Sequence, residues 1–367
     1  MRADGYQQHY VAMLAVTLMI GCGEVHRVRV IDRIERSGRF TTVDKPLPTL
    51  DSIDHVRGSV VEMFGGASIR IDSANPARDR GVNRDQLVSH PESVQTSWVK
   101  DGEVAVPTDI ASLLLLSAYA HFERAAVYFS ELDSIVTENS APCFYDPHIP
   151  ISDDLTVSTV DNAAYVPIAD LFLIMRTEKL GDIPLALNPG VLAHEYAHRV
   201  FYYELWGAEL ADVEMDPLAA NLLGAVDEGV ADYFAARIVN DPQFTSHSLD
   251  ETAAAARDLS TPRQLEVAWL DGTKPTKSGV YDPYPLGTVL AANLWHLVDA
   301  IADLDTAVLA AQRSVRIDLS THGFTYQVGD FEIALLQHLD ESTRIYACAE
   351  LEYTYAAAWN RFSGVCL

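Results

Sequence analysis

Two histidines four residues apart, with a glutamate directly after the first, are the residues of this sequence with the clearest chemistry: His194-Glu195-Tyr196-Ala197-His198. On a helix, side chains four residues apart lie on one face with their Cβ atoms roughly 6 Å apart. Both imidazoles can therefore reach one zinc ion, while Glu195 lies beside the open coordination position as a general base. The alternative is a pair of core or surface histidines that bind no ligand.

The residues around this pair predict a helix with defined ends. Asn188 can cap its N-terminus, Pro189 fits the first helical position, and Gly207 can end it. Apolar residues recur between these ends with helical spacing: Val191, Leu192, Val200, Phe201 and Leu205. We therefore expect both histidines on one helix.

A second helix is predicted from Asp216 to about Val239, and it carries Glu228 and Asp232 on a face otherwise rich in glycine and alanine. Small side chains allow another helix to approach closely. If the two helices pack together, Glu228 can be a third zinc ligand, and Asp232 can accept the outer N–H of a ligating histidine. The alternative is an acidic amphipathic helix whose carboxylates lie in water.

HExxH followed by a downstream glutamate, with an aspartate four residues later, resembles the gluzincin zinc peptidases, in particular the thermolysin-like and fungalysin-like families. This resemblance implies that His194, His198 and Glu228 bind one Zn²⁺. It also implies that Glu195 is the general base and that Asp232 orients a ligating histidine.

The same resemblance implies an α+β, zincin-like catalytic domain. It would have a small mixed sheet with a substrate-binding edge strand, the HExxH helix and a mainly helical C-terminal subdomain. Metzincins match poorly, because Phe201 and Glu204 stand where their glycine and third histidine would be. The 30 residues from His198 to Glu228 exceed the spacing of thermolysin and predict an inserted loop from Ala208 to Met215.

Two flanking segments extend the resemblance. Asn162-Ala163-Ala164-Tyr165 resembles the edge strand with which these families bind the substrate backbone, so Asn162 and Ala163 are expected there. Tyr284-Pro285-Leu286-Gly287 resembles the segment where they place a histidine beside the oxyanion. A tyrosine O–H can donate to an oxyanion as an imidazole does, so Tyr284 is the predicted donor and Tyr281 the alternative. Otherwise both tyrosines are wall residues.

Size and net charge limit the classes of partner that this protein can bind. The chain has 367 residues and 49% hydrophobic content, enough for a sizeable core and, we expect, two folding units. With 26 basic and 52 acidic residues, the net charge of −26 argues against nucleic acid and against electrostatic binding to anionic lipid. The expected partners are protein or peptide substrates, with membrane contact only through an N-terminal lipid anchor.

Residues 1–22 have the pattern of a targeting segment. The apolar run Val11 to Ile20 is too short to span a bilayer, and Leu18-Met19-Ile20-Gly21-Cys22 resembles a bacterial lipobox. In that case Cys22 is lipidated and the protein is a lipoprotein of the cell envelope. The alternatives are an ordinary secretory signal or a true start at Met13. All of these readings place the protein outside the cytoplasm.

The rest of the chain is divided into a β-rich region, 23–106, and a zinc peptidase domain, 107–367, whose zinc-binding core is 188–239. The β-rich region is a propeptide-like remnant, a spacer, or strands that complete the catalytic sheet, and its composition slightly favours the spacer. Cys348 and Cys366 would close a shorter loop than either would with Cys143, but the pairing stays open.

Other elements are expected as a hairpin over 60–71, strands over 155–160 and 171–175, and helices over 110–132, 253–256, 285–300, 330–339 and 350–361.

These features predict an exported zinc metallopeptidase in which Glu195 activates a zinc-bound water. An endopeptidase is favoured, because the sequence has no Gly-x-Met-Glu-Asn segment for holding a substrate's free amine. The alternative is an inactive zinc-binding surface lipoprotein of the same fold. The substituted histidine favours it, and the presence of Glu195 argues against it. No feature decides for or against calcium.

Overall fold

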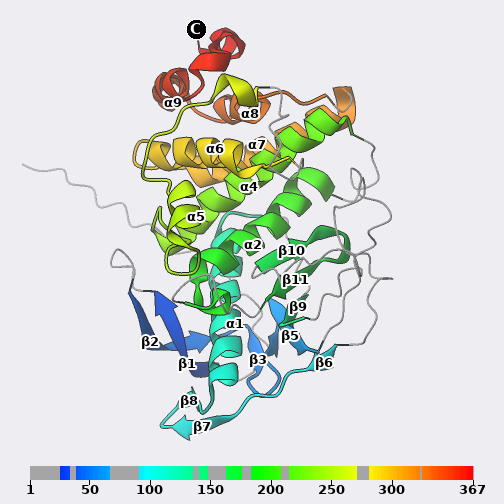
Figure 1. The fold of residues 1–367 in the computed structure, drawn as a ribbon, viewed down its shortest axis with the longest axis vertical. Coiled ribbons are helices and arrows are strands. Elements are labelled where there is room, and N and C mark those ends of the chain that lie inside the picture. The colour runs from blue at the N-terminus through cyan, green and yellow to red at the C-terminus, as the bar shows by residue number, and fades with distance from the viewer. Residues whose placement is uncertain are drawn as a thin grey trace, which may run out of the picture.

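The structure is a computed structural model that describes residues 25–33, 39–66, 91–134, 140–147, 163–175, 183–207, 215–270, 281–322 and 325–366. Its strands gather at one end of the molecule and its later helices at the other, with the C-terminus at the helical end (Figure 1). The fold is α+β, as the sequence predicts. Residues 1–22, including Cys22, lie outside the described residues, as do Asn162, the expected strand over 155–160 and most of the expected inserted loop.

Two sheets form the strand-rich end. One has the order β2-β1-β8-β7, and the other has the path β10-β11-β9-β5-β4-β3 with β6 paired to β5. The first sheet contains β1 (His26–Arg33), β2 (Phe40–Leu47), β7 (Trp98–Asp101) and β8 (Val104–Pro107). The second contains β3 (Leu50–Ser52), β4 (Arg57–Gly58), β5 (Val61–Gly65), β6 (Glu92–Ser93), β9 (Ala141–Tyr145), β10 (Ala163–Val166) and β11 (Leu171–Ile174).

Strands from both sides of residue 106 share the second sheet. β5 pairs in parallel with β9, and β9 pairs in parallel with β11. Composition favours a spacer for 23–106, but this pairing instead favours the role of strands that complete the sheet carrying β10. The predicted hairpin over 60–71 is confirmed only in its first strand, because β5 pairs with β6 and residues 67–71 lie outside the described part.

Helix α1 (Ile110–Glu131) runs from the sheets into the helical layer (Figure 1). Its N-cap is Asp109, whose carboxylate accepts from the Ser112 N–H at 2.7 Å. The helix is long and apolar enough to cross a membrane by length and composition, yet 61% of its most apolar window is buried inside the protein. It contacts α2, β1 and α4, which identifies it as a core helix.

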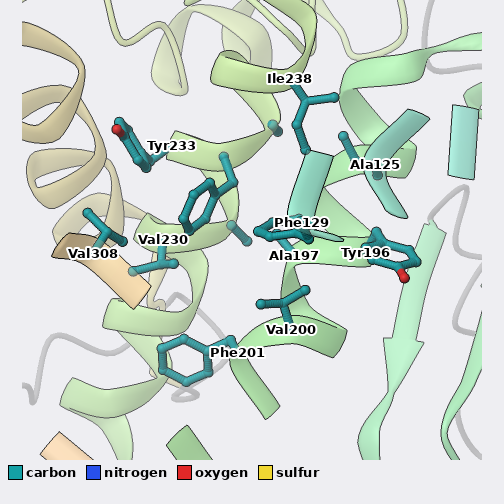
Figure 2. Packing of buried hydrophobic residues seen from close by; sticks show 14 of the residues in the cluster. Ala125, Phe129, Tyr196, Ala197, Val200, Phe201, Val230, Tyr233, Ile238 and Val308 are labelled. Carbon is teal, nitrogen blue, oxygen red and sulfur yellow. The ribbon is translucent and has the colours of Figure 1, made fainter. Parts of the chain in front are cut away.

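The helical end is built on α2 (Pro189–Phe201), α4 (Pro217–Val239) and α6 (Tyr284–Leu297), which pack in sequence against one another. Figure 2 shows side chains of α1, α2 and α4 meeting in the core. The Phe129 ring lies 6.0 Å from that of Tyr196 and 4.9 Å from that of Phe234. Each fully buried aromatic or aliphatic side chain contributes about 1.5–3 kcal/mol, which fixes α2 between α1 and α4.

The remaining helical elements complete the described chain. They are α5 (Glu251–Ala256), α7 (Leu304–His322), α8 (Asp330–Gln337), α9 (Glu341–Thr354), α10 (Ser363–Cys366), the 3₁₀ turns Pro167–Ala169, Leu185–Leu187, Val267–Trp269 and Ala356–Arg361, and the π-helical turn Tyr202–Trp206.

The C-terminal helices differ from the prediction in two places. The sequence predicts no helix over α7, and α9 begins at Glu341 rather than at residue 350. The earlier start follows from Asp340, whose side chain caps α9 by accepting from the N–H groups of Ser342 and Thr343. Cys348 and Cys366 form a disulfide, while Cys143 is buried with a free thiol.

Candidate metal centre

The histidine pair lies on α2, whose start is fixed as the sequence predicts. The Asn188 side chain accepts from the Gly190 N–H at 2.9 Å, and Pro189 occupies the first helical position. After Phe201 the chain continues as one π-helical turn, Tyr202–Trp206, whose C-cap is Gly207 with a φ of 52°.

Three ligand atoms converge where α2 faces α4. The Nε2 atoms of His194 and His198 are 2.9 Å apart, and the Glu228 Oε2 lies 3.4 Å from the first and 3.7 Å from the second. One ligand atom from each of the three residues falls within 4.8 Å of the other two. The helix spacing therefore brings together the three residues that the sequence selected.

Close packing of α4 on α6 sets the position of Glu228. A Cβ atom added to Gly229 would lie 2.5 Å from the carbonyl oxygen of Gly287, and one added to Gly287 would lie 2.7 Å from that of Ala225. The two backbones are therefore in contact directly beside Glu228, and a larger side chain would push α4 away from its place. Small residues on α4 predict close approach of the HExxH helix, and Gly229 admits α6 as well.

Each histidine is oriented by a carboxylate on α4. His194 Nδ1 lies 2.9 Å from Asp232 Oδ1, and His198 Nδ1 lies 2.6 Å from Asp227 Oδ1. Both rings thus direct Nε2 toward Glu228, the orientation that such partners impose on metal-binding histidines. The sequence identified Asp232 but missed Asp227, whose place directly before Glu228 was the available signal.

The residues present fit a zinc ion. Glu228 Oε2 is buried and has no hydrogen-bond partner among the described residues, while two imidazole nitrogens lie beside it. Two histidine nitrogens and one carboxylate oxygen are a common zinc ligand set. Burial lowers the pKa of His198, but the negative charges of Asp227 and Glu228 outweigh burial and raise it to about 10.

Glu195 is held by the edge strand. Its Oε2 accepts from the backbone N–H of Tyr165 on β10 at 2.8 Å, and the residue is buried. β10 is the terminal strand of its sheet path and pairs only with β11 among the described residues. The carboxylate next to the histidine pair is therefore placed by the same strand that the sequence predicted to hold substrate.

A cleft of ≈ 240 Å³ contains these groups, and Tyr284 lies at its wall while Tyr281 does not. Its described lining consists of Ala163, Ala164, Tyr165, Pro167, Leu185, Val191, His194, Glu195, His198, Asp227, Glu228, Phe244, Thr245, Leu249, Arg257 and Tyr284. Tyr284 is 40% exposed, and the negative charge of Glu228 raises its pKa, so its phenol stays protonated and able to donate.

Arg257 is a cleft residue that sequence reasoning missed. Its guanidinium pairs with Asp232, lies 3.1 Å from His194 Nδ1, and stacks over the rings of Phe244 and Tyr284 at 5.5 and 4.9 Å. Burial of Asp232 raises its pKa, but the positive charge of Arg257 outweighs burial and lowers it. No periodic spacing in the sequence predicts that Asp232 and Arg257 pair, because a loop brings the two residues together.

Comparisons with known proteins add little to this geometry. No protein-family model matches the chain, and no curated protein matches it. Fourteen chains of solved structures match, and one of them is the precursor of protealysin, a metalloproteinase from Serratia proteamaculans. That alignment covers 85% of this chain and 90% of the other at 10% identity, with a TM-score of 0.48. Function is therefore inferred from the site itself.

Proposed function

We propose that this protein is a zinc metallopeptidase of the gluzincin type, with a zincin-like catalytic domain that cleaves within peptide chains. One observation carries the proposal: the Nε2 atoms of His194 and His198 converge with Glu228 Oε2, and Glu195 lies in the same cleft beside a strand edge that is unpaired within the described part of the chain. This arrangement joins a metal ligand set, a base and a backbone-binding edge. If these residues had only a structural role, the ligand set, the base and the backbone-binding edge would not need to share one cleft.

His194, His198 and Glu228 would hold the zinc ion, which when bound lowers the pKa of a water molecule and polarises the scissile carbonyl. Glu195 would take the proton of that water on its carboxylate and return it to the leaving amine. General acid–base catalysis of this kind typically contributes about 10²–10⁴-fold in rate. The Tyr165 N–H at 2.8 Å from Glu195 Oε2 keeps the carboxylate in place between the two proton transfers.

The edge of β10 would align the peptide, and its pairing indicates which residue does so. Along a strand, neighbouring residues direct their N–H and C=O groups to opposite sides. Tyr165 directs its N–H away from β11 and toward Glu195, so Ala163, two residues earlier, also faces the open side. The Tyr165 N–H is already used, which leaves Ala163 as the backbone pair for substrate. Asn162 stays a prediction outside the described residues.

Tyr284 is the proposed oxyanion donor. It lines the cleft with a protonated phenol, and the Arg257 guanidinium lies over its ring at 4.9 Å. This contact fixes the ring while leaving its O–H free to turn toward a developing negative charge. Tyr281 does not line the cleft and becomes the weaker candidate.

Export is proposed on the pattern of residues 1–22, with lipidation at Cys22 as the form of anchoring. The disulfide between Cys348 and Cys366 supports this placement, because disulfides persist mainly in oxidising compartments. The alternative function is an inactive zinc-binding surface lipoprotein, which the tyrosine in place of the usual histidine favours.

Zinc content and casein hydrolysis, measured on the purified protein and on Glu195→Gln, test the proposal. We expect one zinc per chain in both proteins and cleavage only by the wild type, with Glu251→Gln on the exposed face of α5 as a matched control that stays active. Bound zinc without cleavage of a broad peptide set would support the inactive alternative. A wild type that binds no zinc would refute the metal centre.

A further inference from the structure

An arginine on the first strand reaches a loop more than 200 residues away. Arg33 ends β1, and only 6% of its surface is exposed. Its guanidinium pairs with Asp241 at 2.6 Å and donates to Ser246 Oγ at 2.9 Å. It also donates to the carbonyl oxygens of Gln243 and Phe244 at 3.2 and 3.1 Å. These acceptors all belong to residues 241–248, which follow α4 and are called the anchor loop below.

The other side of the anchor loop contacts the helix of the metal centre. The Phe244 ring lies nearly parallel to the His194 ring, with centroids 6.3 Å apart and planes 19° apart. A Cβ atom on Gly190 would lie 2.5 Å from the Phe244 carbonyl oxygen, so the first turn of α2 contacts the loop backbone. The Asn188 side chain, which caps α2, also donates to Ser248 Oγ at 2.9 Å.

These two sets of contacts meet at Phe244. The Phe244 carbonyl oxygen that accepts from Arg33 also lies against Gly190. The Phe244 side chain covers His194 and supports Arg257. The anchor loop contains neither helix nor strand, so its shape depends on such side-chain contacts. Arg33 is suited to this task because a planar guanidinium can donate to several fixed acceptors at once.

We propose that Arg33 is a positioning residue of the metal centre: it fixes the anchor loop so that Phe244 forms the cleft wall against His194. The β-rich N-terminal region then serves the site as a support for one of its walls. The zinc part of this inference rests on the proposed function, whereas the ordering of the loop does not.

Two measurements on the full chain test the proposal in Arg33→Ala. Amide hydrogen exchange followed by mass spectrometry reports on peptides that cover residues 241–249 and 186–196. Competition with a chromophoric chelator, using Zn²⁺ alone as the probe, reports metal affinity well below the unfolding temperature. Arg29→Ala is the matched control, because Arg29 lies on the same strand and pairs with Asp44 at 2.7 Å, away from the loop.

We expect faster exchange in both peptides of Arg33→Ala and a zinc affinity lower by about threefold to tenfold, below the roughly 10–100-fold seen for direct partners of ligands. Arg33→Lys should recover part of both effects, and Arg29→Ala should match the wild type. A residue that only supports global stability would lower the unfolding temperature without changing zinc affinity. If Arg33→Ala and Arg29→Ala behave alike in exchange and affinity, the proposal is wrong.

A second variant covers the case in which Arg33→Ala does not fold. Asp241→Asn removes the charge pair with Arg33 but keeps the side-chain oxygen that accepts from the Gln243 N–H. The same two changes are expected in smaller degree, and unchanged exchange and affinity would overturn the proposal. If the wild type binds no zinc, the proposed function fails, and the exchange data alone decide whether Arg33 holds the loop.

Discussion

Glu332 offers a stability test remote from the metal centre. This α8 residue is 3% exposed, and its carboxylate accepts from the buried Tyr355 O–H. Burial raises the pKa of Glu332 from its ordinary value of 4.5 to about 7, although the Tyr355 hydrogen bond opposes this. Asp330 adds negative charge nearby and Arg361 adds positive charge, but Arg361 is paired with Asp330 at 2.6 Å.

The sign of the pH dependence follows from which state keeps the proton. The folded protein holds it up to about pH 7, whereas the unfolded chain releases it near 4.5, so stability is lost as pH rises between these values. At about 1.4 kcal/mol for each pH unit, that interval corresponds to about 3 kcal/mol. Glu332→Gln cannot ionise and its amide oxygen can still accept from Tyr355. Its stability relative to the wild type should therefore increase by about 3 kcal/mol over this window.

Urea unfolding followed by far-UV circular dichroism at about pH 5, 6, 7 and 8 measures this difference. Comparing the two proteins at each pH cancels the contributions of all other titrating groups. Glu352→Gln, on the exposed face of α9, controls for the loss of one negative charge. If the wild type and Glu332→Gln lose stability in parallel as pH rises, the buried carboxyl of Glu332 ionises with its ordinary pKa and the reasoning fails.

Two further predictions concern the cleft. Tyr284→Phe should lower kcat by about 10²-fold with little change in KM, because its O–H would act only in the transition state; steady-state kinetics with a fluorogenic peptide checks this, and an equal loss in Tyr281→Phe would contradict it. Gly190→Ala should destabilise the fold by about 1–3 kcal/mol, because its Cβ would lie 2.5 Å from the Phe244 carbonyl oxygen. Thermal unfolding measures that loss, and an unchanged midpoint would show that the anchor loop is not in contact with α2.

Local spacing explains what the sequence could predict. Residues four apart on a helix share a face wherever the helix lies, so His194 and His198, and likewise Glu228 and Asp232, could be paired before the fold was known. The cap at Asn188 and the start of α4 at Asp216-Pro217 are equally local. The structure brings these residues together, while their catalytic roles remain proposals.

Contacts set by tertiary packing could not be predicted in the same way. Arg257 reaches Asp232 through a loop, and Arg33 reaches Asp241 across more than 200 residues, with no periodic signal linking either pair. Asp227 is a different case, because whether it contacts His198 depends on how far α4 is rotated about its axis. No element was predicted over α7, although its sequence contains no glycine or proline and is compatible with a helix.

The edge of β10 that has no strand partner among the described residues also bears on how the protein behaves at high concentration. An unpaired strand edge that can hold an extended peptide can equally accept a strand from another copy, which is a common route to aggregation. β10 has only four residues, and Pro167, directly after it, has no N–H to donate. Glu195 already occupies the Tyr165 N–H. An intermolecular sheet started here would therefore gain few hydrogen bonds, so this edge can stay open without inviting polymerisation.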